Sequence, residues 1–171
     1  MKNYLNKIYF VFTVLTVLIL EGCFHQTQPD GLPKLYPVTV AVTQDDKPLT
    51  DANVMLVSAS QWTSGGITNS NGFVTLYTHG KYPGVPIGTY KVTVSKIRTE
   101  GDPPPRAPYD AESARIYAEY KKSGKKYTRF QIVPKEYRES ETTPLTIEVK
   151  NGTNMLSLNI IGTVTEPARL N

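Results

Sequence analysis

The stretch of sequence that decides the fold is Pro86-Ile87-Gly88-Thr89-Tyr90-Lys91-Val92-Thr93-Val94-Ser95. From Tyr90 onward, apolar and polar side chains alternate one by one, and a repeat of two residues is the period of a β-strand. Pro86 and Gly88 are typical of a turn directly before such a strand. We therefore predict a strand with one apolar and one polar face, as in a sheet that shows one side to water.

The same alternation recurs on both sides of this stretch. It predicts further strands near residues 38–43, 73–78, 145–150 and 156–160. Residues 53–58 predict another strand, which is apolar on both faces. Turn signals separate these strands, because Asn and Gly tolerate positive φ, as in Asn69-Ser70-Asn71-Gly72 and Asn151-Gly152. About seven short strands with turns between them favour an all-β chain, folded as an antiparallel β-sandwich over residues 37–162.

Residues 97–132 interrupt the alternation and predict an insert that carries one short helix. The insert opens with several prolines, and Asp110 is a suitable N-cap for the helix that follows. Arg115 and Glu119 stand four positions apart and can pair, and Gly124 can end the helix. The spacing places on one helical face the side chains of Ser113, Ile116, Tyr117 and Tyr120.

The first 22 residues have the layout of a secretory signal peptide. Lys2 and Lys7 give a positively charged start, and an uncharged and mostly apolar run follows over residues 8–20. A helix that crosses a bilayer needs roughly 20 such residues, so the run is too short for a membrane span. The run ends at Leu20-Glu21-Gly22-Cys23, which contains the only Cys of the chain.

These four residues resemble the lipobox of bacterial lipoproteins, with a Leu three positions before the Cys and a small residue directly before it. Glu21 departs from the pattern, which usually has a small or apolar residue there. The resemblance implies cleavage between Gly22 and Cys23 and attachment of fatty acyl chains such as palmitate to Cys23, and two or three chains anchor a protein stably. In Gram-negative lipoproteins, an Asp directly after the lipidated Cys favours retention in the inner membrane. The resemblance therefore implies the outer membrane, because this position is Phe24. The alternative is an inert Cys beside an ordinary signal peptide or an uncleaved short anchor.

A polar tether would then connect the lipidated Cys23 to the sandwich, over residues 23–36, and a C-terminal tail would cover residues 163–171. The tether would place the domain in the periplasm or at the cell surface.

A formal net charge of +4 excludes a strongly basic nucleic-acid binder. A single Cys and two His, His25 and His79, offer no set of metal ligands at suitable spacing, so we predict no metal and no other cofactor.

Three motifs resemble those of carboxypeptidase regulatory-like domains. Residues 46–54 resemble G-x-P-L-x-x-A-x-V, with Asp46 in the place of Gly. Residues 66–76 resemble T-D-x-x-G-x-F-x-L, with Asn69 in the place of Asp and Val74 in the place of Phe. Residues 86–94 resemble P-x-G-x-Y-x-V-x-V. Residues 133–137, 142–146 and 151–154 resemble the C-terminal part of small planctomycete-type envelope lipoproteins that carry this domain alone. The resemblance implies a transthyretin-like (prealbumin-like) sandwich that serves as an accessory or adhesive module without catalytic residues. It does not cover the insert.

The function that we predict is that of a non-catalytic, lipid-anchored cell-envelope protein whose sandwich is an interaction or structural module. Its partners would be the membrane, through the anchor, and an envelope protein or a glycan. A carbohydrate-binding lipoprotein is the alternative. A hydrolase or a metal-dependent enzyme ranks last, because the sequence shows no convergent set of catalytic residues.

Two groups of side chains are candidates for contact with a ligand. The aromatic group could stack on sugars and consists of Trp62, Tyr109, Tyr117, Tyr120 and Tyr127. The basic group could meet lipid head groups or acidic polysaccharide and consists of Lys121, Lys122, Lys125 and Lys126. We expect instead that Tyr117 and Tyr120 pack the helix onto a sheet, since a short helix needs tertiary contacts. The lysines would then form a solvated face that complements the helix dipole.

Overall fold

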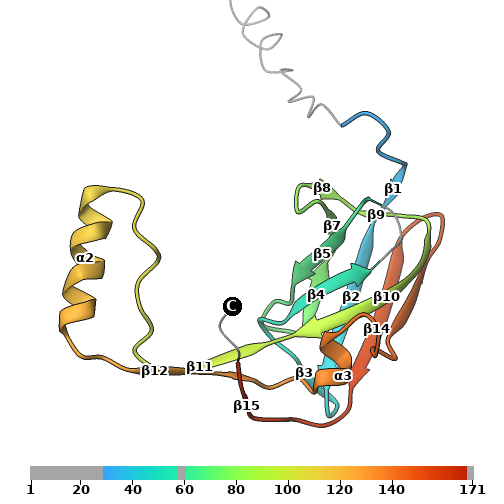
Figure 1. Cartoon of the computed structure of the whole chain (residues 1–171). Helices are drawn as coiled ribbons and strands as arrows, with labels where there is room; N and C mark the ends of the chain where they lie inside the picture. The colour runs from blue at the N-terminus through green and yellow to red at the C-terminus, as the bar shows by residue number, and fades with distance from the viewer. Residues whose placement is uncertain (1–28, 58–60, 169–171) are drawn as a thin grey trace, which may run out of the picture. The chain divides into compact units, whose positions relative to one another are not determined.

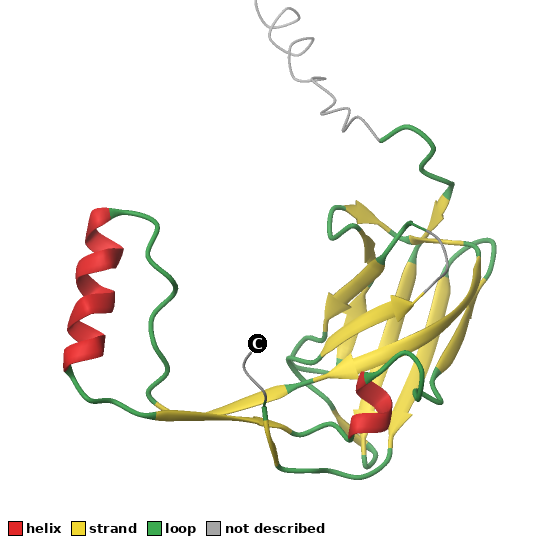
Figure 2. Cartoon of the chain, in the orientation of Figure 1, coloured by secondary structure: helices red, strands yellow, loops and turns green. Residues whose placement is uncertain are grey.

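The structure is a computed structural model that describes residues 29–57 and 61–168. The chain divides into two units, Met1–Gly31 and Leu32–Asn171, and every helix and strand described below lies in the second unit. Strands dominate this unit, as Figure 2 shows in yellow.

Two sheets form the body of the second unit (Figure 1). The larger sheet has the strand order β13 (Thr146–Val149), β10 (Gly88–Ser95), β4 (Asn53–Val57), β5 (Ser64–Ile67), β7 (Tyr77–Thr78) and β8 (Tyr82–Pro83). The other sheet has the order β14 (Asn154–Ile160), β2 (Val38–Gln44) and β3 (Lys47–Pro48), with β6 (Phe73–Thr75) also paired to β2. A small ladder joins β1 (Leu35–Tyr36) to β9 (Val85–Pro86).

Each predicted strand buries one apolar face, although Leu156 of β14 is half-buried and Met55 and Val57, on the other face of β4, are exposed. Val38, Val40 and Val42 of β2 are fully buried and alternate with half-exposed neighbours. Val92 and Val94 of β10 do the same in the larger sheet. Side chains from both sheets belong to one buried cluster, so the prediction of an all-β sandwich is confirmed. Among the described residues the strands pair antiparallel, except that β2 and β14 run parallel and that Tyr77 and Gly84 form an isolated parallel bridge.

The turn before β6 is set by local polar contacts and by one glycine. The side chain of Asn69 accepts hydrogen bonds from the backbone N–H groups of Asn71 (2.9 Å) and Phe73 (3.0 Å). Gly72 has φ of 77°, and a Cβ at this position would lie 2.7 Å from the carbonyl oxygen of Val42. Only glycine avoids both the left-handed strain and this clash.

We call residues 97–132 the arm. It consists of β11 (Ile97–Gly101), α2 (Ala111–Lys122) and β12 (Tyr127–Gln131), and its two strands pair from Ile97 opposite Gln131 to Gly101 opposite Tyr127. Figure 1 shows β11 and β12 as a ribbon that leads from the sandwich to α2. The sequence predicted the helix but not these two strands.

Two short elements follow the arm. The one-turn helix α3 (Lys135–Arg138) carries the buried ring of Tyr137, and β15 (Glu166–Pro167), in the predicted tail, pairs with the end of β12. Arg138 and Glu166 form an ion pair that joins α3 to β15. The tail therefore includes a strand that supports the base of the arm.

Candidate functional site

The candidate site is the arm, and buried polar contacts fasten its base to the sandwich. Gln44, at the end of β2, donates from Nε2 to the carbonyl oxygens of Ile132 (2.9 Å) and Gly162 (2.7 Å). This one amide therefore joins the sandwich, the end of the arm and the C-terminal segment. Because the side chain of Gln44 is buried, the two hydrogen bonds are shielded from competing water.

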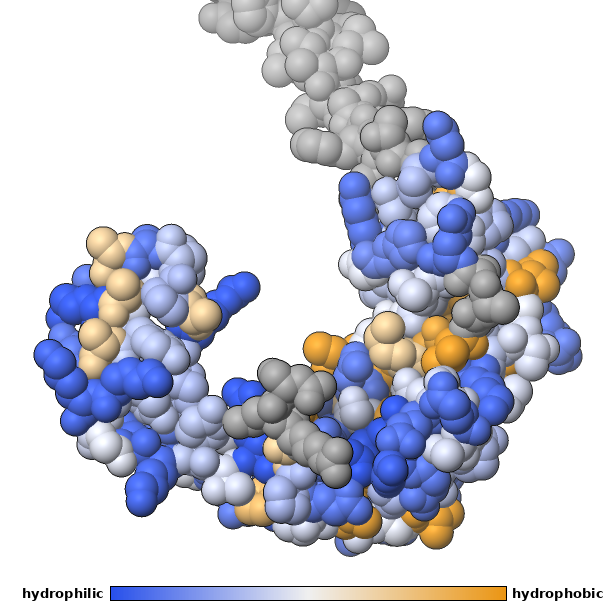
Figure 3. All heavy atoms as spheres, viewed as in Figure 1, coloured by the Kyte–Doolittle hydropathy of each residue, from blue (hydrophilic) through white to orange (hydrophobic). Residues whose placement is uncertain are grey.

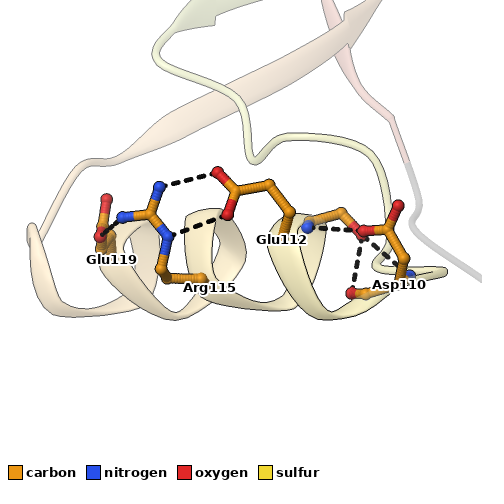
Figure 4. Close-up of polar contacts among 5 residues, drawn as sticks. Asp110, Glu112, Arg115 and Glu119 are labelled. Atoms are coloured by element: carbon orange, nitrogen blue, oxygen red, sulfur yellow. Dashed lines mark hydrogen bonds and ion pairs between the residues drawn. The ribbon is translucent and has the colours of Figure 1, made fainter.

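Asp110 and Ser113 begin α2 with a reciprocal cap (Figure 4). The N–H of Ser113 donates to Oδ1 of Asp110 at 2.8 Å, and the N–H of Asp110 donates to Oγ of Ser113 at 3.1 Å. These bonds satisfy two donors that a helix start otherwise leaves without partners. The hydrogen bonds from Ser113 also lower the pKa of the Asp110 carboxyl. The predicted role of Asp110 as N-cap is confirmed.

Arg115 lies between two glutamates on the same helix (Figure 4). Its Nη2 lies 2.7 Å from Oε1 of Glu112, and its Nη1 lies 2.7 Å from Oε1 of Glu119, so the predicted pair with Glu119 is confirmed. The guanidinium lowers the pKa of Glu112. These pairs are exposed to water, so each adds little to stability, although together they favour the helical state.

No residue of α2 is buried, so the expectation that Tyr117 and Tyr120 pack the helix onto a sheet is wrong. Instead, the hydroxyl of Tyr120 donates to the backbone carbonyl of Asp102 at 2.7 Å, within the arm itself. A groove of about 420 Å³ lies between α2 and the proline-rich segment, lined by Pro103, Pro105, Ile116, Glu119, Tyr120, Ser123 and Lys125. For Tyr120, the proline-rich segment and the adjacent Asp102 thus take the place of the expected sheet.

Two of the four aromatic candidates of the arm lie beside cations. Nζ of Lys121 lies 5.7 Å from the ring centroid of Tyr117, and the guanidinium of Arg129 lies 5.4 Å from that of Tyr127. Tyr109, directly before the N-cap, is 81% exposed. Tyr117, Tyr120 and Tyr127 are half-buried, so part of each ring faces solvent.

The four candidate lysines form what we call the basic surface, namely Lys121, Lys122, Lys125 and Lys126, and all four are exposed. Lys121 and Lys122 belong to the last turn of α2, where cations complement the helix dipole as expected. Lys125 and Lys126 follow Gly124 and lie beyond the helix. Figure 3 shows that the visible face of the arm is mostly hydrophilic.

Trp62 lies in the sandwich, whereas the four candidate tyrosines lie in the arm. It lies two residues before β5, and its ring centroid is 5.1 Å from that of His79, at a tilt of 35°. A groove of about 470 Å³ lies nearby, lined by Met55, Thr63, Ser64, Gly65, Gly66, His79 and Gly80. No local pattern predicts that His79 lies beside Trp62, because the pairing of β5 with β7 brings the two residues together.

The expected lipidation site lies outside the described residues, which contain neither a group of metal ligands nor a helix that could span a membrane. Gly22 and Cys23, the expected cleavage and lipidation residues, precede residue 29. Across residues 29–57 and 61–168, no three or more His, Cys, Asp or Glu side chains are grouped so that they could hold a metal ion. No helix in this described part of the chain has the length and apolar character needed to cross a membrane.

No model of a protein family matches the chain, and no curated protein matches it in sequence. Among solved structures, the chain is similar to a 9R-lipoxygenase from Cyanothece PCC8801, with 13% sequence identity and a TM-score of 0.29. The match covers 94% of this chain and 24% of the lipoxygenase chain. A likeness of this size supports no conclusion about fold or activity.

Proposed function

We propose that the chain is a non-catalytic, lipid-anchored module of the cell envelope that binds another envelope component through its arm. The observation that carries this proposal is that α2 is a folded helix of twelve residues, none of which is buried. Segments that a stable scaffold presents to solvent commonly carry binding function.

The local sequence supports this interpretation because it stabilises α2 without help from the core. Isolated helices of about twelve residues are marginal in water, and tertiary packing usually stabilises them. Here the Asp110–Ser113 cap, the Arg115 ion pairs and the hydrogen bond from Tyr120 to Asp102 supply local support instead. A helix held in this way keeps most of its surface accessible to a partner.

The expected lipid anchor would hold the arm close to a membrane surface. Cleavage before Cys23 and acylation of its thiol would fix the chain to a membrane. The described sandwich begins at β1, so residues 23–34 would serve as a tether of at most about 43 Å when fully extended. Metabolic labelling with a fatty acid tests the anchor, since a Cys23→Ser variant would then lose the label.

The binding role is tested with full chain purified in a non-ionic detergent and envelope fragments from the source cells. The informative variant replaces residues 102–126 with Asn-Gly, because Gly101 and Tyr127 are paired and a two-residue turn closes such a hairpin. We expect saturable binding by the full chain and loss of binding by this arm-replaced variant, at an unchanged thermal unfolding temperature of the sandwich. Equal binding by both proteins would contradict the proposal.

Carbohydrate binding at Trp62 is the second candidate function. The Trp62–His79 ring pair and the adjacent apolar groove favour it, because an aromatic ring can stack on the C–H face of a sugar. A glycan array with the full chain and a Trp62→Ala variant tests this function. Signals that disappear in the variant would support it, and identical patterns would remove it.

A further inference from the structure

We infer that the partner of the arm is an acidic polysaccharide, whose acid groups meet the basic surface while its sugar rings contact the neighbouring tyrosines. This inference rests on the proposed function and names the class of partner that the arm takes. Two observations carry it, the distribution of charge over the second unit and the pairing of rings with cations along the arm.

The net positive charge of residues 32–168 comes entirely from the arm. The arm has eight Lys or Arg and five Asp or Glu, which gives +3. The remainder of residues 32–168 has eight of each, which gives zero. Residues 121–129 alone contain five cations and no acid. A polyanion would therefore be attracted to this part of the domain in preference to the sandwich.

Much of this charge is not neutralised within the protein. Lys122 and Lys126 form no ion pair with any residue of the described ranges, 29–57 and 61–168. Lys125 lies 3.8 Å from Oδ2 of Asp102, a long contact between side chains that are both more than half exposed. Such a pair contributes little and can exchange for an anionic ligand.

The rings favour a saccharide over a lipid head group or an acidic polypeptide. Cation and ring recur together in Tyr117 with Lys121, Tyr127 with Arg129, and Phe130 with Arg98 at 5.8 Å. A polymer of acidic sugars offers both partners in each repeat, a carboxylate for the cation and a C–H face for the ring. A bilayer would instead favour a continuous apolar stripe, whereas α2 exposes Arg115 and its two glutamates.

The test measures binding of the full chain in non-ionic detergent to four probes. These are polygalacturonate, neutral dextran, polyglutamate and vesicles of phosphatidylglycerol with phosphatidylcholine. We expect polygalacturonate to bind most tightly, with an affinity that falls by about tenfold or more between low and high salt as the charges are screened. Equal or tighter binding of polyglutamate or of the vesicles would overturn the inference, and so would absence of binding to polygalacturonate.

Two matched variants locate the site. The first changes Lys121, Lys122, Lys125 and Lys126 to Gln, and the control changes the exposed Lys47, Lys81, Lys135 and Lys150 to Gln, so both lower the net charge equally. We expect about a tenfold or larger loss of affinity for the first variant and less than about twofold for the control. Equal losses would show that only net charge matters and would overturn the inference.

A third variant separates ring contact from charge. Tyr117→Leu with Tyr127→Leu keeps apolar bulk but removes the aromatic faces, and we expect about a threefold to tenfold loss of affinity for polygalacturonate with none for polyglutamate. An unchanged affinity for polygalacturonate would overturn the part played by the rings. If polygalacturonate fails but the arm-replaced variant still loses binding to envelope fragments, the proposed function stands and this inference alone falls.

Discussion

Asp110 and Ser113 each accept a hydrogen bond from the other's backbone N–H, at 2.8 Å from Ser113 to the Asp110 carboxylate and at 3.1 Å from Asp110 to the Ser113 hydroxyl. This reciprocal contact lies in a helix without a buried residue. The start of α2 therefore depends on two side chains of its own sequence rather than on the core, and this allows the helix to be tested separately from the sandwich.

Asp110→Ala should loosen α2 without weakening the sandwich. Loss of the cap leaves helix N–H groups without a partner, and we expect amide hydrogen exchange in residues 111–117 to become about fivefold faster. Exchange in the buried strands β2 and β10 should not change, and neither should the thermal unfolding temperature. If the unfolding temperature of the whole domain falls together with the protection of α2, the helix is coupled to the core and the account of the arm is wrong.

The helix should also be sensitive to acid. The pKa values of Asp110 and Glu112 are lowered by Ser113 and by Arg115 respectively, so both carboxylates favour the folded helix when ionised. This contribution is complete above their usual values of 3.8 and 4.5 and is lost as the pH falls through the lowered pKa values. NMR chemical shifts of α2 should therefore report loss of helix below about pH 4. Asp110→Asn, which caps without titrating, should retain more helix there.

Gln44 should control how firmly the arm is held. Its amide donates to the carbonyl oxygens of Ile132 and Gly162, and Gln44→Met would leave both half-buried acceptors without this donor. We expect a loss of about 1–3 kcal/mol in the free energy of unfolding, together with faster hydrogen exchange in β12 and β15. Thr43→Val, which changes the more exposed neighbour in the same strand, provides the control. Unchanged exchange in β12 would show that Gln44 does not fasten the arm.

Gly72 and Gly152 offer a matched test of the turn geometry. Both have positive φ, of 77° and 96°, but a Cβ at Gly72 would lie 2.7 Å from the Val42 carbonyl oxygen, while nothing lies within 4 Å of a Cβ at Gly152. Gly72→Ala should therefore cost about 2–4 kcal/mol in the free energy of unfolding, and Gly152→Ala only about 1 kcal/mol. Urea denaturation measures both changes. If the two variants lose the same free energy of unfolding, the close approach of the Val42 carbonyl oxygen does not exclude a Cβ at position 72.

The sandwich was predictable from the sequence because its strands alternate so regularly. Val38, Val40 and Val42 are buried as the period of two requires, and Asn69 and Gly72 form the turn expected of them. The helix was predictable for a similar reason, since Asp110 as cap and Arg115 with Glu119 are local signals.

What escaped prediction depends on contacts between distant residues. The strands β11 and β12 lack a clear alternation of apolar and polar residues, and their side chains are exposed or half-buried. The sequence pattern therefore does not predict that Ile97 pairs with Gln131. The same absence of a core face explains the wrong expectation for Tyr120, whose partner is the backbone of Asp102. The proximity of His79 to Trp62 likewise follows from strand pairing alone.

The most direct test of the central claim is site-specific photo-crosslinking in living cells. A photo-reactive amino acid is placed either at Lys122, on the basic surface, or at Lys47, an exposed position of the sandwich in β3. We predict a discrete, irradiation-dependent adduct from position 122 and none from position 47, because the arm is the part that meets the partner. Adducts of equal yield from both positions, or from position 47 alone, would contradict the claim that the arm is the binding element.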